Sequence, residues 1–421
     1  MPSSIPQLKY TAPVFVLLSI AGFYFIVLHM VLSHAPDRFL EVHEASMVPL
    51  SVTPKLPISI LDKLFTPLVS FFVAAFGDVG RTSSSYPITL DFVWSFGAAI
   101  QLPLVEASRP GASSKWLLTI PMAWGILYQR VSGGWVLPLW LLVWMQSRSR
   151  AEGAVIEKLN AESILAGWWI GHTLPAMAML IPGMPSFTSA PIWIAFPILM
   201  SLGQQAYLAL ARFVPSISNG KNGSGYIATQ LVYLSSLSLS AIAHAHVVII
   251  PGLAATDVPS TMSDSNAFYN KLTGLLGHIY AHYVPPSFAI PSPQTTTAIT
   301  GVQHFVQFDV LIVFTAVWIA GLWDLALRRR QHRTSVGEIR WLVRSALLLL
   351  SIGLVFGPGA PTAGLFAYRE KMLEDDRHRP EPDHTEKDDE NLIITIESPP
   401  RSPRSPHTPS FKRKMSPYHD Q

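Results

Sequence analysis

The stretch Gln303–Arg333, QHFVQFDVLIVFTAVWIAGLWDLALRRRQHR, determines the class of protein. Its apolar part, residues 305–327, is long enough to cross a bilayer as a helix, since about 20 residues at 1.5 Å each span the hydrocarbon core. Three arginines follow at 328–330, as expected on the cytoplasmic side. Asp309 and Asp324 lie inside the span, and a carboxylate at membrane depth usually faces a protein interior. The stretch therefore predicts a membrane protein with a polar interior and a helix that runs from lumen to cytosol.

The composition supports this class. Of the 421 residues, 49% are hydrophobic and 14% are charged, whereas soluble domains carry about 25% charged residues. The net charge of +3 is too small to indicate a nucleic-acid partner. The chain has no cysteine, which excludes disulfides, thiolate nucleophiles and cysteine-ligated zinc. The first apolar run, 12–32, is long for the core of a signal peptide, so we expect a retained first helix.

The hydropathy pattern predicts an all-α, polytopic membrane bundle of about eight to ten transmembrane helices. Besides 305–327, spans are expected at 12–32, 64–76, 88–105, 164–181, 191–210, 226–250 and 342–365, the last interrupted by Gly357-Pro358-Gly359. Residues 116–145 form either one long helix or two short segments. Arg130, Gly133 and Gly134 favour a break or re-entrant turn there. Within the long loop 251–300, residues 267–284 have the spacing of a surface-lying helix.

The expected organisation is an N-terminal segment 1–11, a transmembrane domain 12–366 and a charged tail 367–421. The tail is rich in Pro and Ser and cannot bury enough apolar surface to order itself. We expect a multi-pass protein of the endoplasmic reticulum membrane.

The basic loops set the orientation of the second half of the chain. Lysine and arginine gather in loops 146–163, 212–225 and 328–341, which predicts that these loops face the cytosol. Strict alternation then puts the tail in the lumen, whereas its SPRSP run is typical of a cytosolic phosphorylation target. This conflict and the side of the N-terminus stay open at this level.

Carboxylates inside the spans are the main candidates for chemistry. Asp91 and Glu106 are 15 positions apart, as are Asp309 and Asp324, which is about 22 Å along a straight helix. The two acids of one helix therefore cannot serve one reacting centre. A working pair must come from different helices at one depth, and Asp309 is expected at a depth similar to that of His244.

Each acid also has a structural interpretation. Glu106 can pair with Arg109 at i+3, and Asp324 can be the counter-ion of the arginines one turn later. Asp309 and Asp91 have no cation within a helical turn, which makes them the stronger functional candidates. A hydrogen bond to a neighbouring helix is the alternative for both.

Other polar residues allow several roles. His172 and His244 could accept protons, bind a metal or donate a hydrogen bond between helices. Gln129 and Arg130 could bind a polar head group, or Arg130 could extend to the interface. The sequence contains no Walker loop, DDxxD, HExxH or GxSxG motif. This argues against ionisation-type prenyl chemistry, ATP-driven pumps and hydrolases.

Short motifs in a fixed order carry a family resemblance. They are Glu106-x-x-Arg109-x-Gly111, Gly125-x-x-Tyr128-Gln129, Pro191-x-Trp193-x-x-x-Pro197, Gln307-Phe308-Asp309, and Gly357-Pro358-Gly359-Ala360 followed by Tyr368-Arg369-Glu370. Over roughly residues 12–373 the chain resembles the fungal integral-membrane proteins of meroterpenoid and indole-diterpene gene clusters. That group includes the membrane terpene cyclases of ascofuranone-, ascochlorin- and macrophorin-type pathways.

The resemblance implies a cyclase that protonates an epoxide or a terminal alkene of a prenyl chain and passes the cation along that chain. Asp309 or Asp91 would be the acid, and His244 or the second of these carboxylates would take the final proton. Glu106 is a further catalytic candidate. Substrate contacts are expected from Gln129, Arg130, His172 and Gln307. No metal or cofactor is expected. The expected partners are a lipophilic prenylated small molecule, membrane lipid and other pathway enzymes at the membrane.

Two other classes of function remain open at this level. A transporter of a lipophilic metabolite would show repeated halves with broken helices in corresponding positions. The segments 130–134 and 357–361 are candidate breaks, although their surroundings are dissimilar in sequence. A non-catalytic scaffold for pathway enzymes would tolerate Asp91→Asn and Asp309→Asn.

Overall fold

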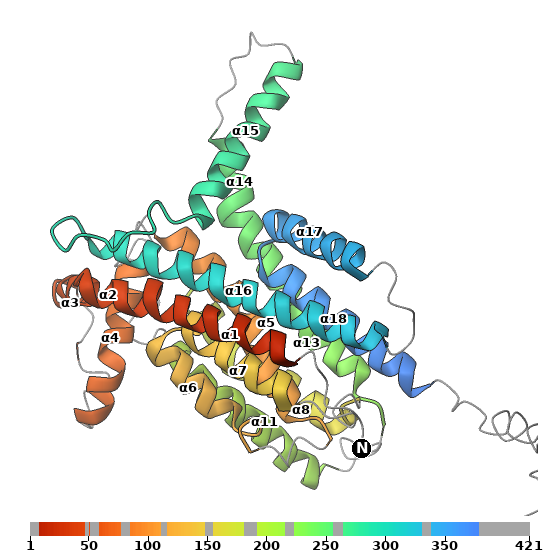
Figure 1. The fold of residues 1–421 in the computed structure, drawn as a ribbon. Coiled ribbons are helices and arrows are strands. Elements are labelled where there is room, and N and C mark those ends of the chain that lie inside the picture. Colours follow the sequence, from red (N-terminus) through yellow and green to blue (C-terminus); the bar gives the residue numbers. More distant parts are fainter. Residues whose placement is uncertain are drawn as a thin grey trace, which may run out of the picture. The chain divides into compact units, whose positions relative to one another are not determined.

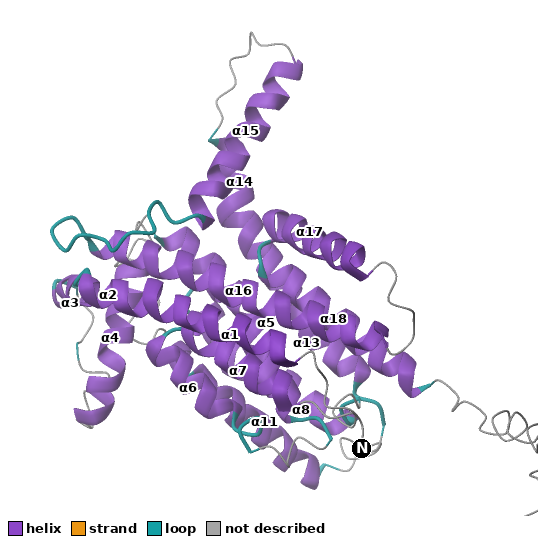
Figure 2. Cartoon of the chain, viewed as in Figure 1, coloured by secondary structure: helices purple, strands orange, loops and turns teal. Residues whose placement is uncertain are grey.

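The computed structural model describes residues 8–46, 50, 59–76, 85–110, 116–147, 155–180, 192–214, 223–255, 264–330 and 338–378. All regular elements in these ranges are helices, which confirms the predicted all-α class (Figure 2). Five of these helices are long and apolar enough to cross a membrane, by length and composition: Ala12–Leu32, Tyr86–Ala107, Tyr226–Ala254, Ala298–Arg329 and Ile339–Phe356. The protein is an all-α polytopic bundle.

Several helices are continuous through a short π-helical segment, labelled η. The order is α1 Leu8–Gly22, η1 Phe23–Leu28 and α2 His29–Leu32; α3 Ala35–Glu44; α4 Ser59–Phe76; α5 Tyr86–Ala107; α6 Pro121–Val131; α7 Gly133–Ser147; α8 Lys158–Trp168, η4 Trp169–Thr173 and α9 Leu174–Ala178; α11 Phe196–Phe213; α13 Tyr226–His244, η5 Ala245–Ile249 and α14 Ile250–Ala254; α15 Asp264–Tyr283; α16 Ala298–Arg330; α17 Glu338–Phe356; and α18 Gly359–Arg377 (Figure 1).

Helix α5 is the centre of the bundle. Every residue from Ile88 to Glu106 is buried, as expected for a helix that is apolar on all sides. Helices α13, α16, α18 and α8 surround it. The polar side chains of α5 are therefore forced to find partners on these neighbours, because lipid and water are both excluded.

Contacts along α5 fix the direction of its neighbours. Helix α13 is antiparallel to α5, since Ser95 bonds Ser240 at 2.9 Å and Gln101 donates to Ser236 at 3.0 Å. Helix α18 is parallel to it, since Gly359 lies against Ser95 whereas Arg369 contacts Glu106. The bundle thus has two ends. We call them the histidine end, which holds His29, His244, His282 and His304, and the arginine end, which holds Arg109, Arg328 and Arg369.

The basic loops meet at the arginine end. The backbone N–H of Lys158 donates to Gly223 at 2.9 Å, and Ser224 donates to Glu374 of α18 at 2.8 Å. Arg328 lies at the same end on α16. The arrangement is consistent with the predicted cytosolic side for all three loops.

The orientation of the N-terminal helix follows from its contacts with α7. Ser19 donates to the Trp135 carbonyl at 2.9 Å, and Gly22 packs directly on the Gly134 backbone. Because α2 continues to the histidine end, α1 begins at the arginine end. The N-terminal helix therefore starts on the side of the basic loops.

The break predicted at Gly357-Pro358-Gly359 is present, but residues 342–365 do not form one span, because they belong to two helices that run in opposite directions. Gly357 adopts φ +78°, a left-handed conformation that favours glycine, and the chain reverses between α17 and α18. Helix α18 then returns to the arginine end. It continues to Arg377, so the ordered chain extends past Ala367, where the tail was expected to begin. Residues 379–421 lie outside the described part.

This reversal resolves the conflict over the tail. If α16, α17 and α18 each cross, α18 ends on the side of Arg328, which is the side expected for the SPRSP run later in the sequence. We predict that reporters fused to the two ends of the chain are both accessible to protease in sealed microsomes with the cytosolic face outward, as is a reporter in loop 212–225. Protection of the C-terminal reporter alone would contradict the pairing of α17 with α18.

The region 116–145 is broken, as the sequence favoured. Helix α6 ends at Val131 and α7 begins at Gly133, and Ser132 between them has φ 122°. A helix is also present where one was expected at 267–284, namely α15, which extends away from the rest of the bundle (Figure 1).

Candidate active site

One carboxylate at the histidine end gathers three hydrogen-bond donors from two helices, α13 and α15. Asp91 of α5 is 1% exposed. Its Oδ2 lies 3.1 Å from Nδ1 of His244 on α13, 3.1 Å from Nε2 of His282 on α15, and 2.5 Å from the hydroxyl of Tyr283. Its other oxygen, Oδ1, is buried and makes no hydrogen bond within the described residues. All the partners of this carboxylate are therefore on one oxygen.

His244 makes hydrogen bonds through both of its ring nitrogens. Its Nε2 lies 3.2 Å from the carbonyl of Leu354, which can only accept, so Nε2 carries a hydrogen. Nδ1 lies 2.9 Å from the hydroxyl of Tyr283 and 3.1 Å from Oδ2 of Asp91, so the imidazole links these two groups to α17.

Two local features place His244. The Leu354 carbonyl is free to accept because it belongs to the last turn of α17, where carbonyls lack partners within the helix. Gly357 lies against His244, with a built Cβ at 3.0 Å from the histidine Cβ, so a larger residue would crowd the imidazole. The π-helical segment η5 begins directly after His244, and such segments are frequent at functional sites.

Tyr283 is kept in its protonated form. It lies at the end of α15, and burial raises its pKa well above the usual value, with a further increase from the Asp91 carboxylate. The phenol is also 2.9 Å from Nδ1 of His244. It can therefore donate to either neighbour without losing its own proton at neutral pH.

Gln307 of α16 holds the end of α15 in place. Its amide nitrogen lies 3.1 Å from the carbonyl of Ala281, 3.2 Å from that of His282 and 3.4 Å from that of Val284. These carbonyls end a helix and would otherwise lack donors. The predicted substrate contact by Gln307 stays a prediction, but the geometry gives its amide group a positioning role.

Asp309 lies in a different environment from Asp91. Its Oδ1 accepts a hydrogen bond from Ser132 at 2.9 Å and another from the backbone N–H of Gly134. Gly134 is in the first turn of α7, so Asp309 of α16 caps the start of that helix. The positive end of the helix dipole also favours a negative charge at this position. The structure thus provides the interhelical hydrogen bond that was the alternative interpretation of Asp309.

We predict that Asp309→Ala destabilises the protein by about 1 kcal/mol, because the start of α7 loses its acceptor. Asp309→Asn should cost less, since the amide oxygen can still accept from Gly134. The midpoint of thermal unfolding in detergent would measure both. Equal losses for the two variants would mean that the charge of Asp309, and not its acceptor, stabilises the helix.

Glu106 belongs to a buried ionic network at the arginine end. Its carboxylate accepts from Arg109 at 2.9 Å, from Arg369 at 2.6 Å and from the indole of Trp144 at 2.9 Å. The local pair with Arg109 is confirmed. The catalytic role predicted for Glu106 is untested, and the length of α5 separates it from Asp91.

The same network contains Asp324. Its Oδ2 accepts from Arg369 at 2.5 Å and from Arg328 at 3.4 Å, which confirms the pairing with the arginine cluster. Glu370 completes the network through Arg109. Arg369 and Glu370 were assigned to the disordered tail, although the sequence motif Tyr368-Arg369-Glu370 already marked them. Both are buried.

The remaining predicted site residues lie apart from Asp91. His172 on η4 is fully buried within a box of aromatic rings: Trp94, Trp168, Trp193 and Phe196 lie with ring centroids 5.6 to 6.4 Å away. Gln129 donates to the Ile194 carbonyl at 3.3 Å, and Arg130 is exposed. The last two line a small pocket between α4, α6 and α11.

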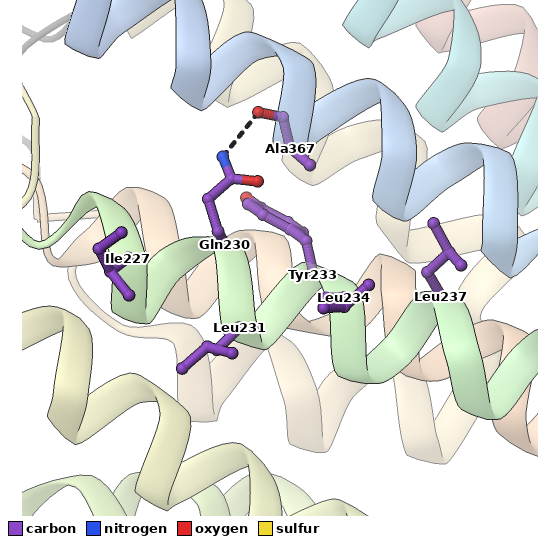
Figure 3. A pocket seen from close by; sticks show the side chains of 7 residues that line it. All are labelled: Ile227, Gln230, Leu231, Tyr233, Leu234, Leu237 and Ala367. Atoms are coloured by element: carbon purple, nitrogen blue, oxygen red, sulfur yellow. Dashed lines mark hydrogen bonds between the residues drawn. The ribbon is translucent and has the colours of Figure 1, made fainter.

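A larger pocket lies on the side of α13 (Figure 3). It has a volume of about 210 Å³ and an almost entirely apolar lining, which Leu231, Leu234 and Leu237 share with Tyr233 and Ala367. Gln230 donates across it to the Ala367 carbonyl at 2.8 Å, as Figure 3 shows. The pocket is nearer the arginine end than Asp91, since Tyr233 interacts electrostatically with Glu370 and Arg109.

Sequence reasoning missed two of the three donors to Asp91. His282 and Tyr283 stand at the end of the expected surface helix, where nothing in the sequence connects them to a carboxylate 191 and 192 positions earlier. A weak signal was available. Both residues can donate hydrogen bonds and they end a helix that is otherwise amphipathic.

The fold and the site define a polytopic, all-α membrane protein with a buried carboxylate–histidine–tyrosine cluster at one end and a buried ionic network at the other. A family model, the CtvD domain, matches residues 11–374. The chain therefore belongs to the CtvD domain family. No curated protein and no solved structure match it significantly.

Proposed function

We propose that this chain is a membrane-bound terpene cyclase in which Asp91 delivers the initiating proton. The observation that carries the proposal is the asymmetry of this carboxyl group, with donors on Oδ2 and none on Oδ1. A proton on Oδ1 would be free to approach a substrate. His244, His282 and Tyr283 would stabilise the negative charge that its departure leaves on the carboxylate.

The proposed reaction is an isomerisation. Oδ1 of Asp91 protonates the oxygen of an epoxide, or the terminal carbon of an alkene, on a prenyl chain. The C–O bond of the epoxide breaks, the next double bond attacks the cation, and new C–C bonds form rings. A hydroxyl group captures the last cation and then loses its own proton, or a neighbouring carbon loses a proton. In either case the released proton returns to the Asp91–His244 pair, so no atom is gained or lost.

Several features are consistent with this chemistry. A lipophilic prenylated substrate partitions into the membrane in which the bundle lies. The resemblance to the membrane terpene cyclases of meroterpenoid pathways points to the same substrate class, and to the endoplasmic reticulum as the location. Of the two acids that the sequence favoured, Asp91 is the better candidate, because Asp309 already caps α7 with Oδ1.

The test uses microsomes from a host that expresses this chain without pathway partners. They receive an epoxidised farnesyl-phenol in the presence of EDTA, and mass spectrometry searches for an isomer of unchanged mass. An isomer absent from control microsomes would support the proposal. A product heavier by one water would support acid opening of the epoxide but not cyclisation. If folded protein gives no product from several epoxides and alkenes, the proposal fails, and transport or scaffolding becomes the better explanation.

A further inference from the structure

Helix α15 carries an apolar stripe that no described part of the chain covers. Four apolar residues at intervals of four, Phe268, Leu272, Leu276 and Tyr280, are exposed by 70%, 42%, 53% and 66%. Residues at this spacing lie on one side of a helix, with a drift of about 40° per step. The stripe is therefore continuous along α15.

The other faces of α15 differ from this stripe. Leu275 and His278 pack on Gly252 of α14, and Ile279 is buried. Asn270, Thr273 and Gly277 lie on the remaining side, and a Cβ built on Gly277 meets nothing within 4 Å. The helix is thus amphipathic along its exposed surface, which is the pattern of helices that lie in a membrane interface.

The partner of the stripe can be inferred from the elements that lead into α15. Helix α13, η5 and α14 form a candidate membrane span, and Ile242, Ile250 and Leu253 are exposed on it, where lipid would cover them. Helix α15 packs on α14 and extends across the direction of α16 (Figure 1). A helix that runs across the spans, at the end of one of them, would lie along the membrane surface, where its stripe would meet lipid chains.

The inner end of α15 reaches the candidate active site. His282 and Tyr283 contact Asp91 there, and Gln307 bonds the last carbonyls of the helix. The rest of α15 makes few contacts with the bundle, since its packing is confined mainly to α14 and η5. Whatever holds the outer part of α15 therefore also orients the two donors.

We propose that α15 lies in the membrane interface at the histidine end, with its apolar stripe among lipid chains, and that this contact holds His282 and Tyr283 against Asp91. The membrane contact stands on the geometry of α15 alone. Its effect on catalysis rests on the function proposed above. The partner is the lipid surface itself, and not a second protein.

Single-cysteine labelling tests the membrane contact. Because the chain has no cysteine, the variants Leu272→Cys and Asn270→Cys can each be labelled with one environment-sensitive fluorophore. The labelled full-length proteins are then reconstituted in phosphatidylcholine vesicles. The label at 272 should be quenched by spin-labelled lipid and shielded from iodide. The label at 270 should show the reverse. Equal quenching of both by iodide would place α15 in water and overturn the proposal.

A stripe variant tests the coupling to the site. Leu272→Ser, Leu276→Ser and Tyr280→Ser together should increase amide hydrogen exchange at residues 279–284, while exchange in α5 and α16 stays unchanged. The matched control replaces Asn270, Thr273 and Gly277 by Ser and should leave exchange at the native level. Native protection in the stripe variant would overturn the coupling.

Product formation gives a third, separate readout. Loss of hydrogen bonds to a charged group should lower the rate of isomer formation in the stripe variant about tenfold or more. If the unaltered protein forms no isomer, the proposed reaction fails, but labelling and exchange still decide whether α15 binds lipid. The two proposals can therefore fail independently.

Discussion

Asp91→Asn is expected to lower the rate of isomer formation about 10²- to 10⁴-fold without loss of membrane-inserted protein. The side chain keeps its shape but has no acidic proton, so it cannot initiate the reaction. The amide can still bond His244 or Tyr283, which protects the packing of α5 against α13 and α15. The initial rate in microsomes, normalised to protein level, measures the effect.

Two controls make this result specific. Asp309→Asn keeps an acceptor for the start of α7 and should retain most activity, because Asp309 serves as a cap. Asp37→Asn changes an exposed carboxylate and should have no effect. Full activity in Asp91→Asn would remove Asp91 as the acid. Loss in Asp309→Asn alone would transfer that role to Asp309.

Arg369→Met is expected to give the largest loss of stability, about 3–5 kcal/mol. Arg369 is 1% exposed and bonds Asp324 at 2.5 Å and Glu106 at 2.6 Å. The network holds three carboxylates, those of Glu106, Asp324 and Glu370, and three guanidinium groups, those of Arg109, Arg328 and Arg369. Removal of one guanidinium leaves buried negative charge without compensation. The midpoint of thermal unfolding and the yield of monodisperse protein measure the loss.

An exposed ion pair supplies the matched control. Arg38 bonds Glu41 at 2.8 Å with comparable geometry, but both side chains are accessible to solvent. Arg38→Met should cost at most about 1 kcal/mol. Adding Glu106→Gln to Arg369→Met should recover part of the stability, since it removes one of the uncompensated charges. If Arg369→Met and Arg38→Met cost the same, the network does not stabilise the fold.

The two candidate helix breaks of the transport alternative have different structures. One candidate break, near Ser132, is an interruption between two helices capped by Asp309. The other, at Gly357, is a turn between the antiparallel helices α17 and α18. The two sites are therefore different structures. They do not form the pair of corresponding broken helices that is expected of a transporter with repeated halves.

The sequence by itself determined the helical class and the approximate positions of the five helices that are apolar enough to cross a membrane, because these depend on local hydropathy. It also predicted correctly that the two acids of α5 lie at different depths, since helical rise alone separates Asp91 from Glu106. The break near Ser132 followed from glycine and arginine at membrane depth. Each of these properties is read within one segment of the chain.

Only the tertiary structure decided which groups meet. His282, Tyr283 and Asp91 converge because α15 ends where α5 begins, and Gln307 fixes that end. Arg369 became a central ion partner because Gly357 turns the chain back into the bundle, so that residues expected in a polar tail are buried. Buried polar groups must find partners wherever the fold provides them. The identity of those partners depends on helix directions and contacts across the bundle, which local sequence patterns do not contain.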